Sequence, residues 1–244
     1  MKAFLKKITP KTIINWRRAY LTKIGLHRHD AEFSNRNSKD IFSEVYKRRM
    51  WGGNTDYFSG HGSHLSDHVK PYVEAVSQFL SRFSDPLIVV DLGCGDFNIG
   101  RQIKDKASNY IACDVVPDLI ERNKEIYAGS GVNFRVLDIT DDELPQGDIV
   151  LIRQVLQHLS NADIAKVVSK LHRYKYLVLT EHIPACNFIP NVDHKTGSYS
   201  RMARGINSGV VLTAPPFNLA IKSQEIICET LEQDSLLRVI VYEF

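Results

Sequence analysis

The stretch Val89-Val90-Asp91-Leu92-Gly93-Cys94-Gly95-Asp96-Phe97-Asn98 reads as a short buried strand that runs into a glycine-containing turn. Glycine at 93 and 95 lets the backbone turn sharply and come close to a ligand. A dinucleotide-binding fingerprint would require glycine at position 98, and it would place a pyrophosphate beside Asp91 and Asp96. Because two carboxylates would repel that group, the turn favours a cationic ligand.

The rest of the chain places this turn in an α/β sheet. Helical or connecting segments at 98–106, 118–128 and 155–172 alternate with apolar runs at 87–91, 110–114, 132–137, 148–152 and 176–180. This alternation predicts parallel strands joined by crossover helices. Two further β-rich runs, 223–231 and 236–243, are joined by the link Glu232–Ser235 and predict an antiparallel hairpin. We therefore expect a Rossmann-like, doubly wound sheet of seven mostly parallel strands, with a ligand beyond the carboxyl end of the first strand.

Local signals predict where several helices begin or end. Residues 41–50 look helical, and Trp51-Gly52-Gly53 should end that helix. A helix should open at Pro71, because proline is favoured in a first helical turn. The pattern Ser160-x-x-Asp163 is a capping-box-like start for another helix.

The glycine turn resembles the first motif of the class I S-adenosylmethionine-dependent methyltransferases, whose cofactor carries an ammonium and a sulfonium. The resemblance covers roughly residues 70–244 and includes the acids at successive strand ends and the terminal hairpin. It implies that Asp114 accepts both ribose hydroxyls, that Asp138 receives the adenine amino group, and that the stretch from Arg153 lies beneath the methionine moiety. The implied cofactor-binding residues are Asp91, Gly93, Cys94, Gly95, Asp114, Asp138, Ile139 and Arg153. The family's frequent third loop glycine is Phe97 here, which predicts an altered loop path.

A finer resemblance concerns the methyl acceptor. The stretches Thr180-Glu181-His182-Ile183-Pro184, Ser208-Gly209-Val210 and Pro215-Pro216-Phe217 resemble bacterial methyltransferases of surface-polysaccharide and natural-product gene clusters. This implies a small-molecule hydroxyl acceptor, such as a sugar or a phosphorylated or lipid-linked glycan precursor. A nitrogen acceptor on a small metabolite or a protein is one alternative, and a non-catalytic adaptor that binds a membrane or a partner is another. A nucleic-acid acceptor is disfavoured, because no Asn-Pro-Pro-aromatic or Asp-Pro-Pro-aromatic segment follows the fourth strand.

Three residues are candidates for the catalytic role. Methyl transfer requires an acceptor atom held in line with the methyl group, and a hydroxyl must also lose a proton. His158 lies just beyond the fourth predicted strand, and Glu181 and His182 should end the fifth. All three are therefore expected at the ligand-binding edge of the sheet.

An insertion at 181–222 should cover the acceptor. Arg201 and Arg204 are candidates to bind a phosphate or carboxylate on it, but a solvated loop is the favoured interpretation for both of them and for Asp193, His194 and Lys195. On the other side of the site, Trp51-Gly52 and Ser59-Gly60-His61-Gly62-Ser63 suggest a mobile lid, and we call residues 51–63 the lid segment. His61, His64 and His68 would share a face only on a continuous helix, and the nearby glycines argue against a metal site there.

Composition excludes several classes of protein. With 244 residues, 43% of them hydrophobic and 24% charged, the chain predicts one elaborated globular domain. The longest apolar runs are far shorter than the ~18 residues that cross a bilayer. The cysteines are scattered without close pairing, which suggests reduced thiols in a cytoplasmic protein; they are Cys94, Cys113, Cys186 and Cys228.

Charge is concentrated at the amino terminus. Residues 1–29 hold five lysines, three arginines and no acid, which leaves 23 basic against 28 acidic residues in the rest of the chain. The apolar stripe in this segment predicts a basic amphipathic helix, formed by Ile13, Trp16, Tyr20, Leu21 and Ile24. It could pack on its own domain or a second subunit, lie on an anionic membrane surface, or touch nucleic acid. We divide the chain into residues 1–69, with this helix and the lid segment, and a methyltransferase domain at 70–244.

Overall fold

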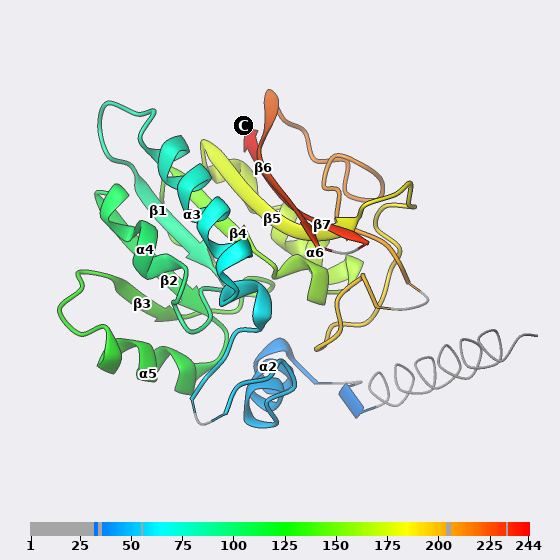
Figure 1. Ribbon diagram of the computed structural model, residues 1–244, viewed down its shortest axis with the longest axis horizontal. Coiled ribbons are helices and arrows are strands. Elements are labelled where there is room, and N and C mark those ends of the chain that lie inside the picture. Colours follow the sequence, from blue (N-terminus) through cyan, green and yellow to red (C-terminus); the bar gives the residue numbers. More distant parts are fainter. Residues whose placement is uncertain (1–31, 34–35, 55, 204–205, 233) are drawn as a thin grey trace, which may run out of the picture.

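The computed structural model describes residues 32–33, 36–54, 56–203, 206–232 and 234–244. Within them, seven strands form one sheet in the order β3-β2-β1-β4-β5-β7-β6 (Figure 1). The strands are β1 (Ile88–Leu92), β2 (Asn109–Asp114), β3 (Asn133–Val136), β4 (Ile149–Arg153), β5 (Tyr176–Pro184), β6 (Ser223–Glu232) and β7 (Ser235–Glu243). Strands β1 to β5 pair in parallel, whereas β7 runs antiparallel between β5 and β6. The predicted Rossmann-like sheet with its terminal hairpin is confirmed.

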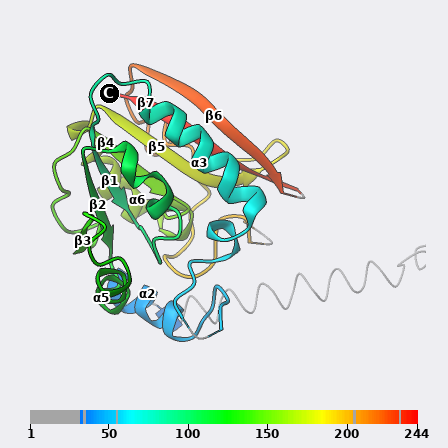
Figure 2. The ribbon, with the colours of Figure 1, turned by 60° about the vertical axis from the view of Figure 1, so that its left-hand side comes forward.

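Helices cover both faces of the sheet because successive side chains of a strand point to opposite sides. Val90 and Leu92 of β1 enter one core together with α6 (Asn161–Val168), and Val89 enters the other core with α3 (Ser66–Leu80) and α4 (Gly100–Ile103). Helix α5 (Pro117–Ile126) supplies side chains to both cores. Figure 2 shows α3 alongside β6, with which it packs.

The predicted strands begin and end within one residue of the observed ones, except at the end of the fifth. Strand β5 continues to Pro184 because β7 pairs with it along its whole length. Glu181 and His182 therefore lie inside the strand, opposite Arg238 and Leu237, and not at its end as expected.

The predicted helix start at Pro71 is wrong. Helix α3 begins at Ser66, and the backbone N–H groups of His68 and Val69 already donate to the carbonyl of Leu65. Pro71 lies inside the helix, where its missing N–H removes only the bond to the carbonyl of Asp67. The helix therefore begins before Pro71, whereas a proline usually stands in the first turn of a helix.

The segment before α3 packs against the sheet. Helix α2 (Ser38–Lys47) starts three residues earlier than predicted, because the side chain of Asn37 caps it by accepting the N–H of Asp40 at 2.8 Å. It ends before Trp51, at a turn in which Arg49 has a φ of 53°. Phe42 of α2 joins the same core as β1.

Short 3-10 turns connect several of these elements, namely η1 (His61–Ser63), η2 (Lys104–Lys106), η3 (Leu156–His158) and η4 (Leu171–Arg173). The predicted cap of α6 is confirmed, since Ser160 accepts the N–H of Asp163. None of the helices in the described ranges has both the length and the apolar character that crossing a bilayer requires. The predicted basic helix at 1–29 lies outside the described residues.

Candidate active site

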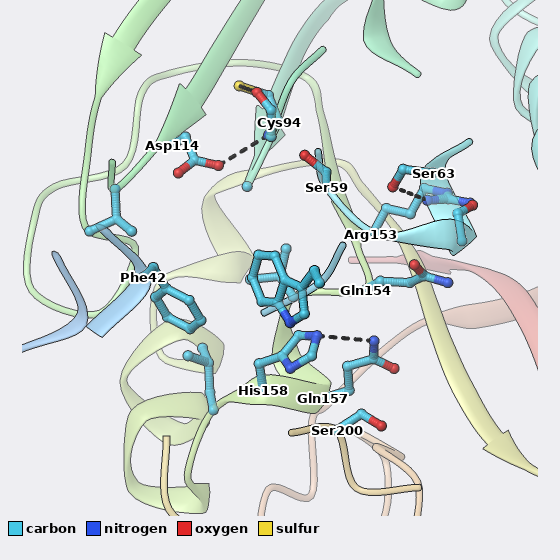
Figure 3. Close-up of a pocket in the computed structure, with 18 of the residues that line it drawn as sticks. Phe42, Ser59, Ser63, Cys94, Asp114, Arg153, Gln154, Gln157, His158 and Ser200 are labelled. Atoms are coloured by element: carbon cyan, nitrogen blue, oxygen red, sulfur yellow. Dashed lines mark hydrogen bonds between the residues drawn. The ribbon is translucent and has the colours of Figure 1, made fainter. Parts of the chain in front are cut away.

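A cavity of about 540 Å³ lies at the carboxyl ends of β1, β2 and β4. Around it, Figure 3 shows Phe42 from α2, Asp114 from β2, Arg153 from β4 and His158 from η3. All eight residues expected to bind the cofactor line this cavity: Asp91, Gly93, Cys94, Gly95, Asp114, Asp138, Ile139 and Arg153. The strand-end position of each residue is what brings them together.

Two glycines make the turn after β1 possible. Gly93 has a φ of 83°, and a Cβ there would lie 2.3 Å from Val155 Cγ2. Gly95 has a φ of 56°, and a Cβ there would lie 2.3 Å from the hydroxyl oxygen of Ser59 in the lid segment. Any larger residue would displace a wall of the cavity at these positions.

Phe97 occupies the position of the family's third loop glycine. Its φ is 62°, in the region that glycine prefers. The ring turns away from the cavity and is fully buried among Tyr110, Tyr127 and Phe134. This packing offsets the backbone strain, and the altered loop path stays a prediction.

Asp91 and Asp114 are buried carboxylates on the same wall. Asp91 accepts the hydroxyl of Tyr110 at 2.9 Å, and Asp114 accepts the backbone N–H of Gly95 at 3.0 Å and that of Val116 at 3.1 Å. Burial raises the pKa of Asp91 to about 7 and that of Asp114 to about 6. A cation or a hydroxyl donor in the cavity would stabilise both charged forms.

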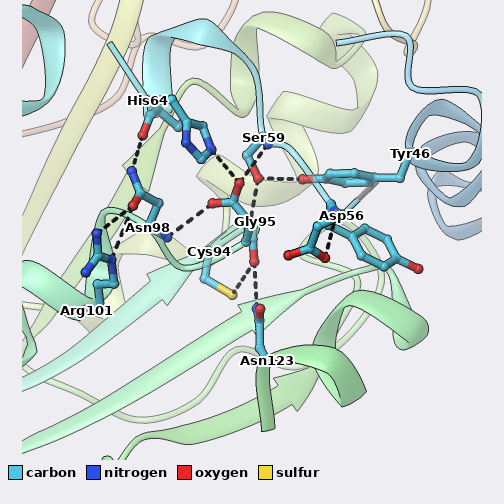
Figure 4. Close-up of polar contacts among 12 residues, drawn as sticks. Tyr46, Asp56, Ser59, His64, Cys94, Gly95, Asn98, Arg101 and Asn123 are labelled. Atoms are coloured by element: carbon cyan, nitrogen blue, oxygen red, sulfur yellow. Dashed lines mark hydrogen bonds and ion pairs between the residues drawn. The ribbon is translucent and has the colours of Figure 1, made fainter. Parts of the chain in front are cut away.

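Asp96 does not face the cavity, contrary to the expectation that it flanks the ligand together with Asp91. Its carboxylate accepts the backbone N–H of Ser59 at 2.9 Å and contacts Nε2 of His64 at 2.6 Å. Its own backbone N–H donates to the Ser59 hydroxyl at 2.8 Å. Figure 4 shows Ser59 and His64 beside Gly95 in this network, so Asp96 fastens the lid segment to the glycine turn.

The loop after β3 forms the far end of the cavity. Asp138 accepts both the backbone N–H and the hydroxyl of Thr140, at 2.9 and 2.6 Å. The ammonium of Lys170 donates to the backbone carbonyls of Ile139, Thr140 and Asp142. This lysine fixes the loop that carries the predicted adenine-binding residues, and the sequence pattern gave no signal for it.

Arg153 ties β4 to the lid segment. Its guanidinium donates to the carbonyl of Gly62 at 2.6 Å and to the hydroxyl of Ser63 at 3.1 Å, and it lies 4.8 Å from the ring centre of Tyr72. Its Nε is buried and has no hydrogen-bond partner among the described residues. This nitrogen is a free donor for an anionic group such as a carboxylate.

The lid segment and α2 form the roof of the cavity. The indole N–H of Trp51 donates to the carbonyl of Ser198 at 3.0 Å, and the indole ring lies 5.1 Å from the ring centre of His158. Tyr46, which no sequence motif marks, forms a hydrogen bond with Ser59 at 2.9 Å and packs edge-on against Trp51. Its spacing of four residues from Phe42 on one helix face was the available signal.

The three candidate catalytic residues occupy different environments. His158 and His182 line the cavity, but Glu181 does not. The Glu181 carboxylate is buried and accepts the backbone N–H groups of Leu156 and Gln157, so it supports η3 from behind. Burial lowers the pKa of His158 to about 4, which leaves its imidazole neutral at pH 7.

Arg201 does not offer a binding group to an acceptor, because it is fully buried. Its guanidinium donates to the carbonyl of Leu159 at 2.7 Å, to the side-chain oxygen of Asn161 at 2.9 Å and to the carbonyl of Val192. It holds the 181–222 insertion onto the domain and is not exposed as predicted. Arg204 lies outside the described residues.

Asp193, His194 and Lys195 of the insertion are not among the residues that line the cavity. Asp193 accepts the backbone N–H of Asn161 at 2.7 Å and that of His194 at 2.9 Å, while Lys195 is exposed.

His61, His64 and His68 do not share a helix: His61 begins η1, His64 follows it, and His68 lies in the first turn of α3. Within the described ranges, no group of three or more His, Cys, Asp or Glu residues is arranged to hold a metal ion.

Residues 90–174 match the sequence profile of a family described as a methyltransferase domain. Among solved structures, the N-methyltransferase NodS from Bradyrhizobium japonicum WM9, in complex with S-adenosylhomocysteine, has a TM-score of 0.61 and 14% identity, covering 84% of this chain and 99% of NodS. The N-terminal domain of EvdMO1, crystallised in the presence of S-adenosylhomocysteine and D-fucose, has a TM-score of 0.53 and 16% identity, covering 86% and 98%.

Magnesium protoporphyrin IX methyltransferase from Synechocystis PCC 6803, with bound S-adenosylmethionine, has a TM-score of 0.52 and 16% identity, covering 86% of this chain and 99% of that one. No curated protein sequence matches the chain. These structural likenesses concern the fold, and the matched domain spans the glycine turn and the strand-end acids. Residues 90–174 are therefore similar to a methyltransferase domain, and the seven-stranded sheet around them has the fold of these solved methyltransferases.

Proposed function

We propose that this enzyme transfers a methyl group from S-adenosylmethionine to a hydroxyl of a small molecule, either a sugar or a phosphorylated or lipid-linked glycan precursor. The observation that carries the proposal is the pair of buried carboxylates, Asp91 and Asp114, beside a glycine turn. Both have a raised pKa, because burial disfavours their charged forms. A ligand with an ammonium, a sulfonium and ribose hydroxyls supplies the positive charge and the hydrogen-bond donors that stabilise the charged carboxylates.

The cavity residues divide the cofactor among them in this proposal. Asp114 accepts the ribose hydroxyls, Asp138 with Ile139 receives the adenine, and Asp91 faces the cationic methionine end. Arg153 offers its unpartnered Nε to the methionine carboxylate. The bound cofactor supplies an electrophilic methyl group, and the lid segment excludes water from it.

The acceptor is expected under Trp51, between the lid segment and His158. A hydroxyl acceptor is supported by the imidazoles that line the cavity, among them the candidate bases His158 and His182. An aromatic wall suits the apolar face of a sugar ring, and the EvdMO1 domain crystallised in the presence of D-fucose has the same fold. A nitrogen acceptor is the second candidate, because NodS, which shares the fold, is an N-methyltransferase.

Two measurements test the proposal. Titration calorimetry with S-adenosylmethionine should show saturable binding that is greatly weakened in Asp114→Asn and unchanged in Asp85→Asn, an exposed acid before β1. A screen of nucleotide sugars and sugar phosphates should then find an acceptor that releases S-adenosylhomocysteine. Absence of binding would refute the cofactor assignment, whereas turnover of amines alone would replace the hydroxyl acceptor with a nitrogen. Binding without turnover of either class would favour the non-catalytic adaptor.

We further propose that the chain divides into an amino-terminal part, residues 1–69, and a methyltransferase domain, residues 70–244. Within the first part, residues 1–29 would place the enzyme peripherally on an anionic membrane surface in the cytoplasm. Their eight basic residues and lack of acids support this, while the acidic remainder of the chain disfavours nucleic acid. Full-length protein should co-sediment with vesicles that contain anionic lipid, and protein lacking residues 1–30 should not. Equal sedimentation of the two would end the membrane proposal.

A further inference from the structure

A histidine and a glutamate form a hydrogen-bonded pair at the edge of the cavity. His182 of β5 lines the cavity, and its Nε2 lies 2.9 Å from Oε2 of Glu232, the last residue of β6. The His182 side chain is 18% exposed and that of Glu232 is 38% exposed, so the carboxylate lies on the solvent side of the pair.

The terminal hairpin creates this contact. His182 pairs with Leu237 of β7, which in turn pairs with Thr230 of β6. Because paired residues share a face and a strand repeats every two residues, Glu232 lies on the same face as Thr230 and His182. The hairpin therefore brings the Glu232 carboxylate of β6 next to His182 of β5, although β7 lies between these two strands in the sheet.

The hydrogen bond determines which nitrogen of His182 carries the proton. A carboxylate accepts a hydrogen bond, so Glu232 selects the tautomer protonated at Nε2. No described residue hydrogen-bonds Nδ1, which leaves its lone pair free on a side chain that lines the cavity. This is the arrangement of a general base with an orienting acid.

His158, another imidazole of the cavity lining, has no carboxylate partner of this kind. Nε2 of His158 lies 3.3 Å from Nε2 of Gln157, and no described carboxylate hydrogen-bonds the ring. With a pKa lowered to about 4, His158 is a weak proton acceptor at neutral pH. It can still orient an acceptor, but His182 is the better candidate to remove a proton.

The charged and titratable groups around His182 come from four elements. Glu232 of β6 favours the protonated imidazole, while His68 of α3 and Arg153 of β4 disfavour it. His158 of η3 is also within electrostatic range. Burial lowers the pKa of His182 overall, which keeps the imidazole neutral and ready to accept a proton at pH 7.

We propose that Glu232 is a positioning residue that holds His182 with an unprotonated Nδ1 toward the cavity, and that this nitrogen takes the proton of an acceptor hydroxyl. The inference rests on the methyl-transfer function proposed above. A bond forms between the acceptor oxygen and the methyl carbon as the carbon–sulfur bond breaks, and its electron pair stays on sulfur. The hydroxyl proton passes to Nδ1, the resulting imidazolium is stabilised by the Glu232 carboxylate, and the proton then leaves to water.

Nitrogen NMR of histidine-labelled protein tests the pair without an identified acceptor. The His182 signals, assigned by their loss in His182→Gln, should report the Nε2-protonated tautomer in the wild-type protein. In Glu232→Gln the pKa of His182 should fall by about one unit and the tautomer preference should weaken, because the negative charge is lost. The matched control is Glu229→Gln on the same strand, whose carboxylate pairs with Arg238 and should leave the His182 signals unchanged.

A second readout reports whether His182 faces the reacting methyl group. Saturation with S-adenosylmethionine should lower the pKa of His182 more than saturation with uncharged-sulfur S-adenosylhomocysteine does, because the sulfonium repels an imidazolium. Equal shifts, or an unchanged tautomer in Glu232→Gln with normal thermal unfolding, would overturn the inference. Failure to bind S-adenosylmethionine in calorimetry would instead refute the proposed function, so the two failures are distinguishable.

Discussion

The affinity for S-adenosylmethionine should depend on pH through Asp91 and Asp114. Both side chains are buried on the cavity wall, with their pKa values raised to about 7 and about 6. A cationic ligand favours their charged forms, so binding below these values must first release protons. The affinity should therefore fall as the pH decreases from 7 to 6, and binding should release protons in that range.

The size of the effect follows from the fraction of each group that is ionised. For Asp91 this fraction drops about fivefold between pH 7 and pH 6, and for Asp114 about twofold. If the bound state requires both charges, the dissociation constant rises about tenfold, or ~1.4 kcal/mol. Near pH 6.5 the two groups together should release about one proton on binding.

Titration calorimetry at both pH values, repeated in two buffers with different ionisation enthalpies, measures the affinity and the proton release together. Asp91→Asn should bind more weakly at pH 7 and keep only the twofold dependence that Asp114 contributes. Asp85→Asn, which removes an exposed acid, should retain the full dependence. An affinity that stays constant between pH 7 and pH 6, or a tenfold dependence that survives in Asp91→Asn, would refute the electrostatic reasoning.

Three other perturbations separate the roles of neighbouring features. Gly95→Ala should weaken cofactor binding at least tenfold in calorimetry, because the new methyl group would lie 2.3 Å from the Ser59 hydroxyl and the residue has a φ of 56°. Gly129→Ala is the control for backbone strain alone, because Gly129 has a φ of 77° and open space around it. Arg201→Met should lower the unfolding temperature by roughly 6–12 °C, since about 3 kcal/mol is lost with its buried hydrogen bonds; an unchanged melting curve would restore Arg201 as a candidate ligand-binding group. In a Trp16→Phe background, Trp51 fluorescence should change when S-adenosylhomocysteine binds, because the indole roofs the cavity, and a constant spectrum would argue against lid movement.

Features set by local pattern could be predicted from the sequence. The sheet followed from apolar runs of strand length, and the cavity residues followed because parallel strands bring their carboxyl ends to one edge. The cap at Ser160 followed from its spacing to Asp163. In each case the deciding interaction lies within a few residues or follows from the topology itself.

Features set by contacts between distant segments could not be predicted. The sequence indicated that Asp96 faces the ligand. In the structure its carboxylate instead accepts the backbone N–H of Ser59, which lies 37 residues away in the chain. Arg201 looked solvated because its loop is polar, but three oxygens from other turns surround it. Nothing local marks Glu232 either, because its partner His182 is brought near by the pairing of three strands.

The bond from Trp51 to Ser198 joins two stretches of chain that both lie outside the matched region 90–174. A fragment trimmed to residues 70–244 would keep all seven strands but would lack α2 and the lid segment, which form the roof of the cavity. A chimera that carries only residues 90–174 would for the same reason contain the glycine turn and the strand-end acids but not the residues that roof the cavity. Changes of substrate in this protein are best sought in residues 38–64 and 198–203, on either side of that bond.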